Sequence, residues 1–146
     1  MQQILINKLH AYLVNNHLDL LISLQEEHRL MPYIQSKVAS VKAYQEELEE
    51  QHRPAYVIEA LCLEELTRDL RPSRFNYMKN LLEEEFETES LRMRESGILT
   101  YEIINLIGAC EPIFEVFGFS EAQEDNKELR YAAMGMISEY IGSYAD

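Results

Sequence analysis

Several features are scarce in this 146-residue chain, and each scarcity excludes a class of protein. Its five glycines do not cluster, so the chain lacks the glycine-rich loop that binds phosphate groups. No apolar run approaches the length that spans a bilayer, because polar residues and a proline interrupt the longest candidate, residues 103–117. No segment alternates apolar and polar residues as a half-buried strand does, and no internal repeat is visible.

Cysteine is also scarce. The two cysteines, Cys62 and Cys110, lie far apart among apolar neighbours. This setting is typical of reduced, buried thiols in a cytosolic protein, so we expect no disulfide. The N-terminus has no basic region before its apolar residues, and polar residues interrupt them, which is unlike a secretory signal peptide. The sequence therefore predicts a cytoplasmic protein.

Basic residues become scarce after the first third of the chain. Thirteen lysines and arginines stand against 26 aspartates and glutamates, which gives a net charge of −13. Residues 1–45 contain four bases and three acids, whereas residues 46–146 contain nine bases and 23 acids. The negative electrostatic field of so many acidic residues opposes direct binding to nucleic acid or to an anionic membrane. It favours a solvated surface, a basic protein partner or cations.

What the chain does have is helical spacing of its apolar residues almost throughout. Pro54, Ser73 and Asn126 are suited to the starts of helices. Residues 5–13 form one apolar stripe and residues 34–48 form another, whereas residues 88–97 are polar, and we expect a break between helices at Gly97. The pattern predicts an all-α fold, with the whole chain as a single compact domain of about five to seven helices.

Residues 110–119 combine a helix start with a helix stop. Pro112 suits the first helical position, where its missing N–H costs nothing. Gly118 suits the left-handed position just past a helix end. Phe114 and Phe119 would then occupy the two positions that touch in a glycine-terminated cap. We therefore expect a packed helical corner that is closed by two aromatic rings.

A metal site has little support. Carboxylate-bridged di-iron bundles need two Glu-x-x-His motifs that project inward. Residues 49–52 give one match, which ends at His52, but the other three histidines lack a glutamate three residues earlier. The glutamates of residues 83–87 are spread around a helix, so they do not converge on one point. We predict no metal and no other cofactor.

Two groups of residues are candidates for an interaction surface. The first is a basic island in the acidic part of the chain, formed by Arg68, Arg71, Arg74 and Lys79, of which the three arginines are the candidate contact residues. It suits an anion or an acidic surface, although the same residues are placed to pair with nearby glutamates across helical turns.

The second group is aromatic. The chain has nine tyrosines, whose amphipathic side chains suit interfaces. Three of them lie on the last predicted helix: Tyr131, Tyr140 and Tyr144. Tyr140 and Tyr144 also fit the apolar stripe of that helix, so they fit its core equally well.

The C-terminal segment also carries a resemblance. Residues 110–121, with the order Cys-Glu-Pro-Ile-Phe-Glu-Val-Phe-Gly-Phe-Ser-Glu, resemble the signature of a family of small helical proteins of unknown function found mainly in Bacteroidetes. Residues 9–17 resemble the opening helix of that family, and residues 60–86 resemble its central pair of helices. Leu18 departs from the family pattern, which has a proline there. The resemblance implies a helical fold and a bacterial source, and it implies no active site.

Three functions from different classes are open to such a chain. The first, which we favour, is a non-enzymatic protein that binds another protein and is itself monomeric or a homo-oligomer. The second is an acidic decoy whose carboxylates imitate phosphates and occupy the groove of a nucleic-acid-binding protein. The third is an enzyme whose site is assembled from distant residues, such as His17, Cys110 and Glu111. Cys110 and Glu111, a thiol beside an acid at a helix start, fit either a structural cap or the edge of a site.

Overall fold

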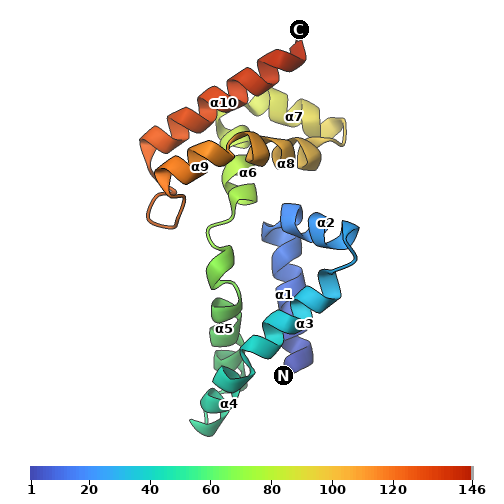
Figure 1. Cartoon of the computed structure of the whole chain (residues 1–146), viewed down its shortest axis with the longest axis vertical. Helices are drawn as coiled ribbons and strands as arrows, with labels where there is room; N and C mark the ends of the chain where they lie inside the picture. The colour runs from blue at the N-terminus through green and yellow to red at the C-terminus, as the bar shows by residue number, and fades with distance from the viewer. Residues whose placement is uncertain (146) are drawn as a thin grey trace. The chain divides into compact units, whose positions relative to one another are not determined.

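The computed structural model describes the backbone of residues 1–145 and the side chains of residues 1–142. Over that range the chain is helical and contains no strand, so the predicted all-α fold is confirmed. Ten α-helices and one short 3-10 helix are present in residues 1–145 (Figure 1). The predicted number of five to seven helices was therefore too low.

Contacts within the chain divide it into two compact units. Unit 1 comprises residues Met1–Arg71, and unit 2 comprises residues Pro72–Asp146. The single domain expected over residues 1–146 stays a prediction, because two compact units can together make up one domain.

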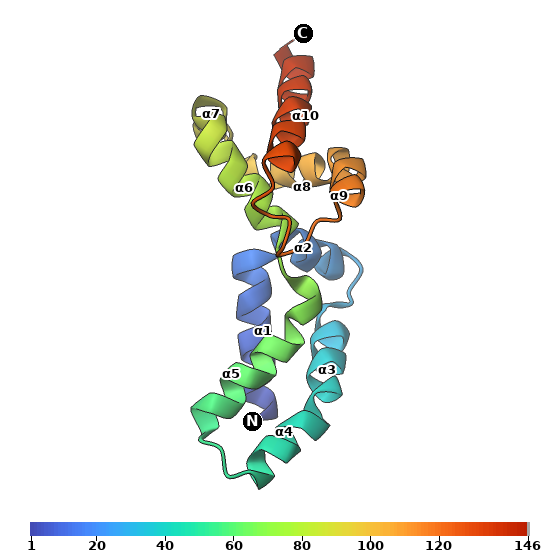
Figure 2. The ribbon, with the colours of Figure 1, turned by 90° about the vertical axis from the view of Figure 1, so that its left-hand side faces the viewer.

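Unit 1 has a core built around its first helix. Its elements are α1 (Gln2–Asn16), α2 (Leu18–Glu26), α3 (Leu30–Ser40), α4 (Lys42–Glu50), α5 (Ala55–Leu66) and the 3-10 helix η1 (Arg68–Leu70). Helix α1 packs against both α3 and α5 (Figure 2). Leu5, Leu9 and Leu13 recur every four residues, so they share one face of α1 and are all fully buried there. The expected apolar stripe of this helix is thus the centre of the core.

Unit 2 contains the other five helices. They are α6 (Arg74–Glu85), α7 (Glu87–Glu95), α8 (Leu99–Ala109), α9 (Glu111–Phe117) and α10 (Lys127–Ala145). Helix α6 packs against α7 and α8, and α10 packs against α6, α8 and α9. Two predicted helix starts are confirmed by their capping hydrogen bonds. The Ser73 hydroxyl accepts one from the backbone N–H of Asn76, and the Asn126 side chain accepts two from the first turn of α10.

A hidden break and an unrecognised helix explain why the predicted number of helices was too low. The stripe over residues 34–48 is divided at Val41, which lies between α3 and α4 and is itself buried. Because Val41 continues the apolar stripe, the sequence pattern does not reveal this break. The break predicted at Gly97 is confirmed between α7 and α8, but most of the polar residues before it form α7, which buries only Ser90 and Met93. A helix with so narrow a buried face gives no apolar periodicity to detect.

Two helices end with a histidine in the left-handed conformation. His28 follows α2 and His52 follows α4, and each has a φ of 57°. The next backbone N–H, of Arg29 or Arg53, donates a hydrogen bond back to the carbonyl of a leucine in the last turn of its helix. These are the bonds of a Schellman-type helix end. His52, the end of the di-iron-like motif, therefore serves as a helix-capping residue.

The expected corner around Gly118 is confirmed. Gly118 has a φ of 60°, and the N–H of Phe119 donates to the carbonyl of Phe114 over 2.9 Å. The rings of Phe114 and Phe119 lie 4.8 Å apart between centroids. Pro112 is the second residue of α9, where its missing N–H is tolerated because no partner exists within the helix.

Gly118→Ala should lower the free energy of unfolding by about 1 kcal/mol, because a Cβ is strained at positive φ. The matched control is Gly135→Ala, in the middle of α10, which should raise it by about 0.5–1 kcal/mol through better helix propensity. An added Cβ meets no atom within 4 Å at either glycine, so only the backbone conformation differs between the two tests. Urea unfolding of the three proteins measures both effects, and equal changes would contradict the left-handed assignment.

Candidate functional site

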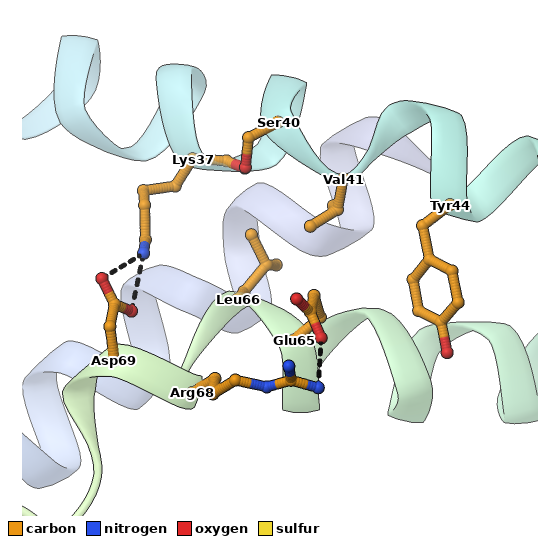
Figure 3. Close-up of a pocket in the computed structure, with 8 residues that line it drawn as sticks. All are labelled: Lys37, Ser40, Val41, Tyr44, Glu65, Leu66, Arg68 and Asp69. Carbon is orange, nitrogen blue, oxygen red and sulfur yellow. Dashed lines mark hydrogen bonds and ion pairs between the residues drawn. The ribbon is translucent and has the colours of Figure 1, made fainter.

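A groove of about 510 Å³ lies in unit 1, where α3 and α4 face α5 and η1 (Figure 3). We call it the unit 1 groove. Its floor consists of Val41 and Leu66, which are buried and point toward each other across the groove. The charged residues of its rim are Lys37, Glu65, Arg68 and Asp69, and the remaining lining residues are Ser40 and Tyr44.

Local structure explains how these residues meet. The break at Val41 ends α3 and starts α4, so Lys37 and Tyr44 project from two different helices along one wall. The opposite wall begins in the last turn of α5 and continues into η1, which carries Asp69. Between them, the buried hydroxyl of Thr67 donates to the carbonyl of Leu63 over 2.9 Å and satisfies the end of α5.

The pair of Lys37 and Asp69 closes one end of the rim. The ammonium nitrogen lies 2.8 Å and 3.0 Å from the two carboxylate oxygens (Figure 3). The hydrogen bond from Lys37 lowers the pKa of Asp69 below its ordinary value of 3.8, although partial burial acts in the opposite direction. Burial raises the pKa of the neighbouring Tyr33 phenol, which therefore stays neutral. Because Lys37 is held in an ion pair, it is unsuited to act as a base or nucleophile.

Asp69→Asn should lower the free energy of unfolding near neutral pH by at most about 1 kcal/mol, because the pair is exposed. The pKa of Asp69 is lower in the folded protein than in the unfolded chain. Its contribution is therefore fully present above the unfolded value of 3.8 and is lost as the pH falls through the lower folded value. Urea unfolding across this range should show the wild type and Asp69→Asn converging at low pH. Lys37→Gln should give the same profile, and a difference that persists in strong acid would contradict the pairing.

The second ion pair lies along the same rim. The Arg68 guanidinium is 2.7 Å from the Glu65 carboxylate, one helical turn earlier. The Ser40 hydroxyl donates to the carbonyl of Lys37 over 2.5 Å, so its proton is directed to a backbone acceptor. No lining residue combines a nucleophile with a neighbouring base. The unit 1 groove offers two kinds of contact: charge pairing at the rim and apolar contact at the floor.

The three predicted arginines are engaged in three different ways. Arg68 pairs with Glu65 across one helical turn, which is the alternative that the sequence left open. Arg71 donates to backbone carbonyls at the end of α5, those of Glu64 and Thr67. Arg74, in unit 2, places its guanidinium 5.0 Å from the centre of the Phe114 ring, where it makes a cation–π contact. Of the three, only Arg68 lines the unit 1 groove.

The predicted tyrosines differ in exposure. Tyr131 on α10 is 65% exposed, so it is available to a partner. Tyr140 is half-buried, and its hydroxyl accepts a hydrogen bond from the Asn105 amide over 3.3 Å. The side chain of Tyr144 lies outside the described residues. Tyr44 was not predicted as a site residue, because it falls within an apolar stripe that is typical of a core.

Cys110 and Glu111 have separate environments. Cys110 is fully buried between α8 and α9, and burial raises the pKa of its thiol to about 11. Glu111 is exposed in the first turn of α9, where a negative charge interacts favourably with the helix dipole. His17 belongs to unit 1, where its Nε2 donates to the carbonyl of Leu70 over 2.6 Å. The surroundings of Cys110, Glu111 and His17 are thus those of residues that stabilise the fold. The predicted burial of both cysteines is confirmed.

Cys110 should resist alkylation in the folded protein. A thiol with a pKa two units above normal has roughly a hundredfold less of the reactive thiolate at a given pH, and burial also blocks access. Iodoacetamide labelling near pH 8, read by mass spectrometry, should modify Cys110 at least about tenfold faster in urea than in buffer. A cysteine placed at an exposed position of α10 by Ser138→Cys is the reactive control. Native labelling of Cys110 at the rate of that control would contradict its burial.

Among the described side chains, those of residues 1–142, no three potential metal ligands of the types His, Cys, Asp and Glu converge. The glutamate run of α6 is partly neutralised. Glu83 pairs with Arg94, and Arg130 lies 2.9 Å from the carboxylates of both Glu84 and Glu85. This pairing weakens the case for an acidic decoy, which needs bare carboxylates. Within the described part of the chain, no helix is both long enough and apolar enough to cross a membrane.

Comparison with known proteins adds no family. No protein-family model, no curated protein and no solved structure matches this chain. The resemblance to a family of Bacteroidetes, with the bacterial source that it implies, stays a prediction.

Proposed function

We propose that this chain is a non-enzymatic protein that binds a short segment of a partner protein in the unit 1 groove. The observation that carries the proposal is the composition of this groove. Two ion pairs, Lys37 with Asp69 and Arg68 with Glu65, border an apolar floor. A tyrosine, Tyr44, lies at one end of the groove. A polar rim around an apolar and aromatic centre is typical of protein–protein interfaces.

The groove also suggests what the partner segment looks like. Val41 and Leu66 favour one apolar side chain, and the ring of Tyr44 adds a rigid amphipathic contact at low entropic cost. Lys37 and Arg68 favour an acidic neighbour, whereas Glu65 and Asp69 favour a basic one. A segment with an apolar residue flanked by charges of both signs satisfies all of these contacts.

A peptide-display selection against the purified chain tests the proposal, because a random library samples partner segments of every composition. Selected peptides should contain an apolar residue flanked by charges of both signs. They should lose at least about tenfold in affinity for Tyr44→Ala, because an interfacial tyrosine is often worth more than 1 kcal/mol. Tyr56→Ala is the matched control, since Tyr56 lies on α5 of the same unit, is exposed and does not line the groove.

A charge swap adds a second control for the ion pair. The double variant Lys37→Asp, Asp69→Lys keeps an ion pair but exchanges the positions of its two charges. The fold is therefore preserved while the rim presents reversed charges. Affinity for the selected peptides should fall although the melting temperature stays near that of the wild type. Peptides that bind all variants equally, or a selection that enriches none, would contradict the proposal.

A further inference from the structure

A second cavity, of about 410 Å³, lies in unit 2 among α7, α8 and α10. Its apolar walls and charged groups come from six residues: Met93, Ile98, Ile141, Glu89, Arg92 and Glu102. The volume lies within the range of small-ligand sites. The cavity belongs to one unit, and none of its residues takes part in the unit 1 groove.

The charged groups lie at different depths. Glu102 on α8 is only 6% exposed, which is unusual for a carboxylate and places it deep in the cavity. Glu89 is half-buried and Arg92 is exposed, one turn apart on α7, so they lie nearer to solvent. The deepest charge of the cavity is therefore negative, and its more exposed part carries one charge of each sign.

Apolar walls and a deep carboxylate select among ligand classes. An anion would meet Glu102 at short range in surroundings of low dielectric constant, where repulsion is strong. A neutral apolar ligand would fill the walls but gain nothing from either glutamate. A cation on an apolar stem suits both the walls and the carboxylates of the cavity. Its stem contacts Met93, Ile98 and Ile141 while its charged head approaches the carboxylates.

We propose that this cavity binds an ammonium group carried on an unbranched aliphatic stem. Two sources share this chemistry: the lysine side chain of a partner protein and a small alkylamine. The four-carbon stem of lysine ends in a compact ammonium with three hydrogen-bond donors, which two carboxylates can accept together.

Titration of the whole ¹⁵N-labelled chain with n-hexylamine near pH 7 tests the proposal. The amide signals of Met93, Ile98 and Glu102 should shift in a saturable manner, with a dissociation constant in the range of about 1 mM that is usual for a ligand of this size. Hexanoate has the same stem and the opposite charge, and it should cause no saturable shift at these amides.

Charge variants make the test specific. Glu102→Gln should weaken binding of n-hexylamine at least about tenfold, because it removes the deepest carboxylate. Two variants nearer to solvent, which leave the core intact, should change affinity by about threefold in opposite directions. Glu89→Gln should weaken binding, and Arg92→Gln should tighten it by removing a like charge. A purely structural role for these residues would not produce opposite signs.

A capped tripeptide with a central lysine distinguishes the two sources. Tighter binding of the tripeptide than of n-hexylamine points to a lysine of a partner protein, and binding of n-hexylamine alone points to a small amine. The proposal is overturned if neither amine gives saturable shifts, if hexanoate binds as well as n-hexylamine, or if the Glu89 and Arg92 variants change affinity in the same direction.

Discussion

Phe114→Ala should lower the free energy of unfolding by about 3–5 kcal/mol, the range found when large core aromatics are truncated. The Phe114 side chain is among the largest fully buried ones of the chain. Its ring meets Tyr77 edge-on at 5.9 Å and Phe119 at 4.8 Å, and it also receives the guanidinium of Arg74. The substitution removes the centre of this aromatic cluster and leaves a cavity that α9, a helix of seven residues, cannot close.

Urea unfolding followed by circular dichroism measures the effect. Val116→Ala is the matched control, because Val116 lies on the same short helix and is 82% exposed. It should change stability by no more than about 0.5 kcal/mol. A loss below about 1 kcal/mol for Phe114→Ala would show that the aromatic cluster does not hold this corner.

Leu13→Ala should lower the free energy of unfolding by about 2–5 kcal/mol. Leu13 is fully buried on α1, the helix that packs against α2, α3 and α5. Truncation at this position therefore removes contacts to several elements of the unit 1 core at once.

The next residue provides the control for Leu13. Val14 is 39% exposed on the same turn, so Val14→Ala should leave stability within about 0.5 kcal/mol of the wild type. The same urea titration compares the two variants. Similar losses at positions 13 and 14 would contradict the assignment of the buried face of α1.

The two core variants also test how the chain unfolds. Leu13 and Phe114 belong to different compact units. If each unit unfolds by itself, the curve contains two transitions, and each variant shifts only one of them. If both variants shift one shared transition, the units unfold as a single cooperative domain, as the sequence predicts.

Local signals predicted much of the fold. Capping chemistry acts within a few residues, so Ser73, Asn126 and Gly118 could be assigned from sequence alone. Periodicity likewise identified the core face of α1. The break at Val41 and the helix α7 could not be predicted. The break at Val41 is hidden within a continuous apolar stripe. Helix α7 has too few buried residues to produce an apolar stripe.

The candidate site was largely beyond prediction. Lys37 and Asp69 are 32 positions apart in the sequence, and they meet because tertiary packing brings α3 and η1 together. No local pattern encodes such a pairing. The predicted arginines and tyrosines were selected for their chemical type, but their partners, such as the ring beneath Arg74 and the amide beside Tyr140, depend on the fold.

The two histidines with positive φ mark positions at which the stability of this chain can be raised. His28 and His52 each carry a Cβ in a backbone conformation that glycine adopts without strain. Glycine at these two helix ends should relieve about 0.5–1 kcal/mol at each position. Both side chains are exposed, and neither lines the unit 1 groove or the unit 2 cavity. A thermostable version for structural or binding work can therefore be engineered at these two positions, with the core and both candidate sites unchanged.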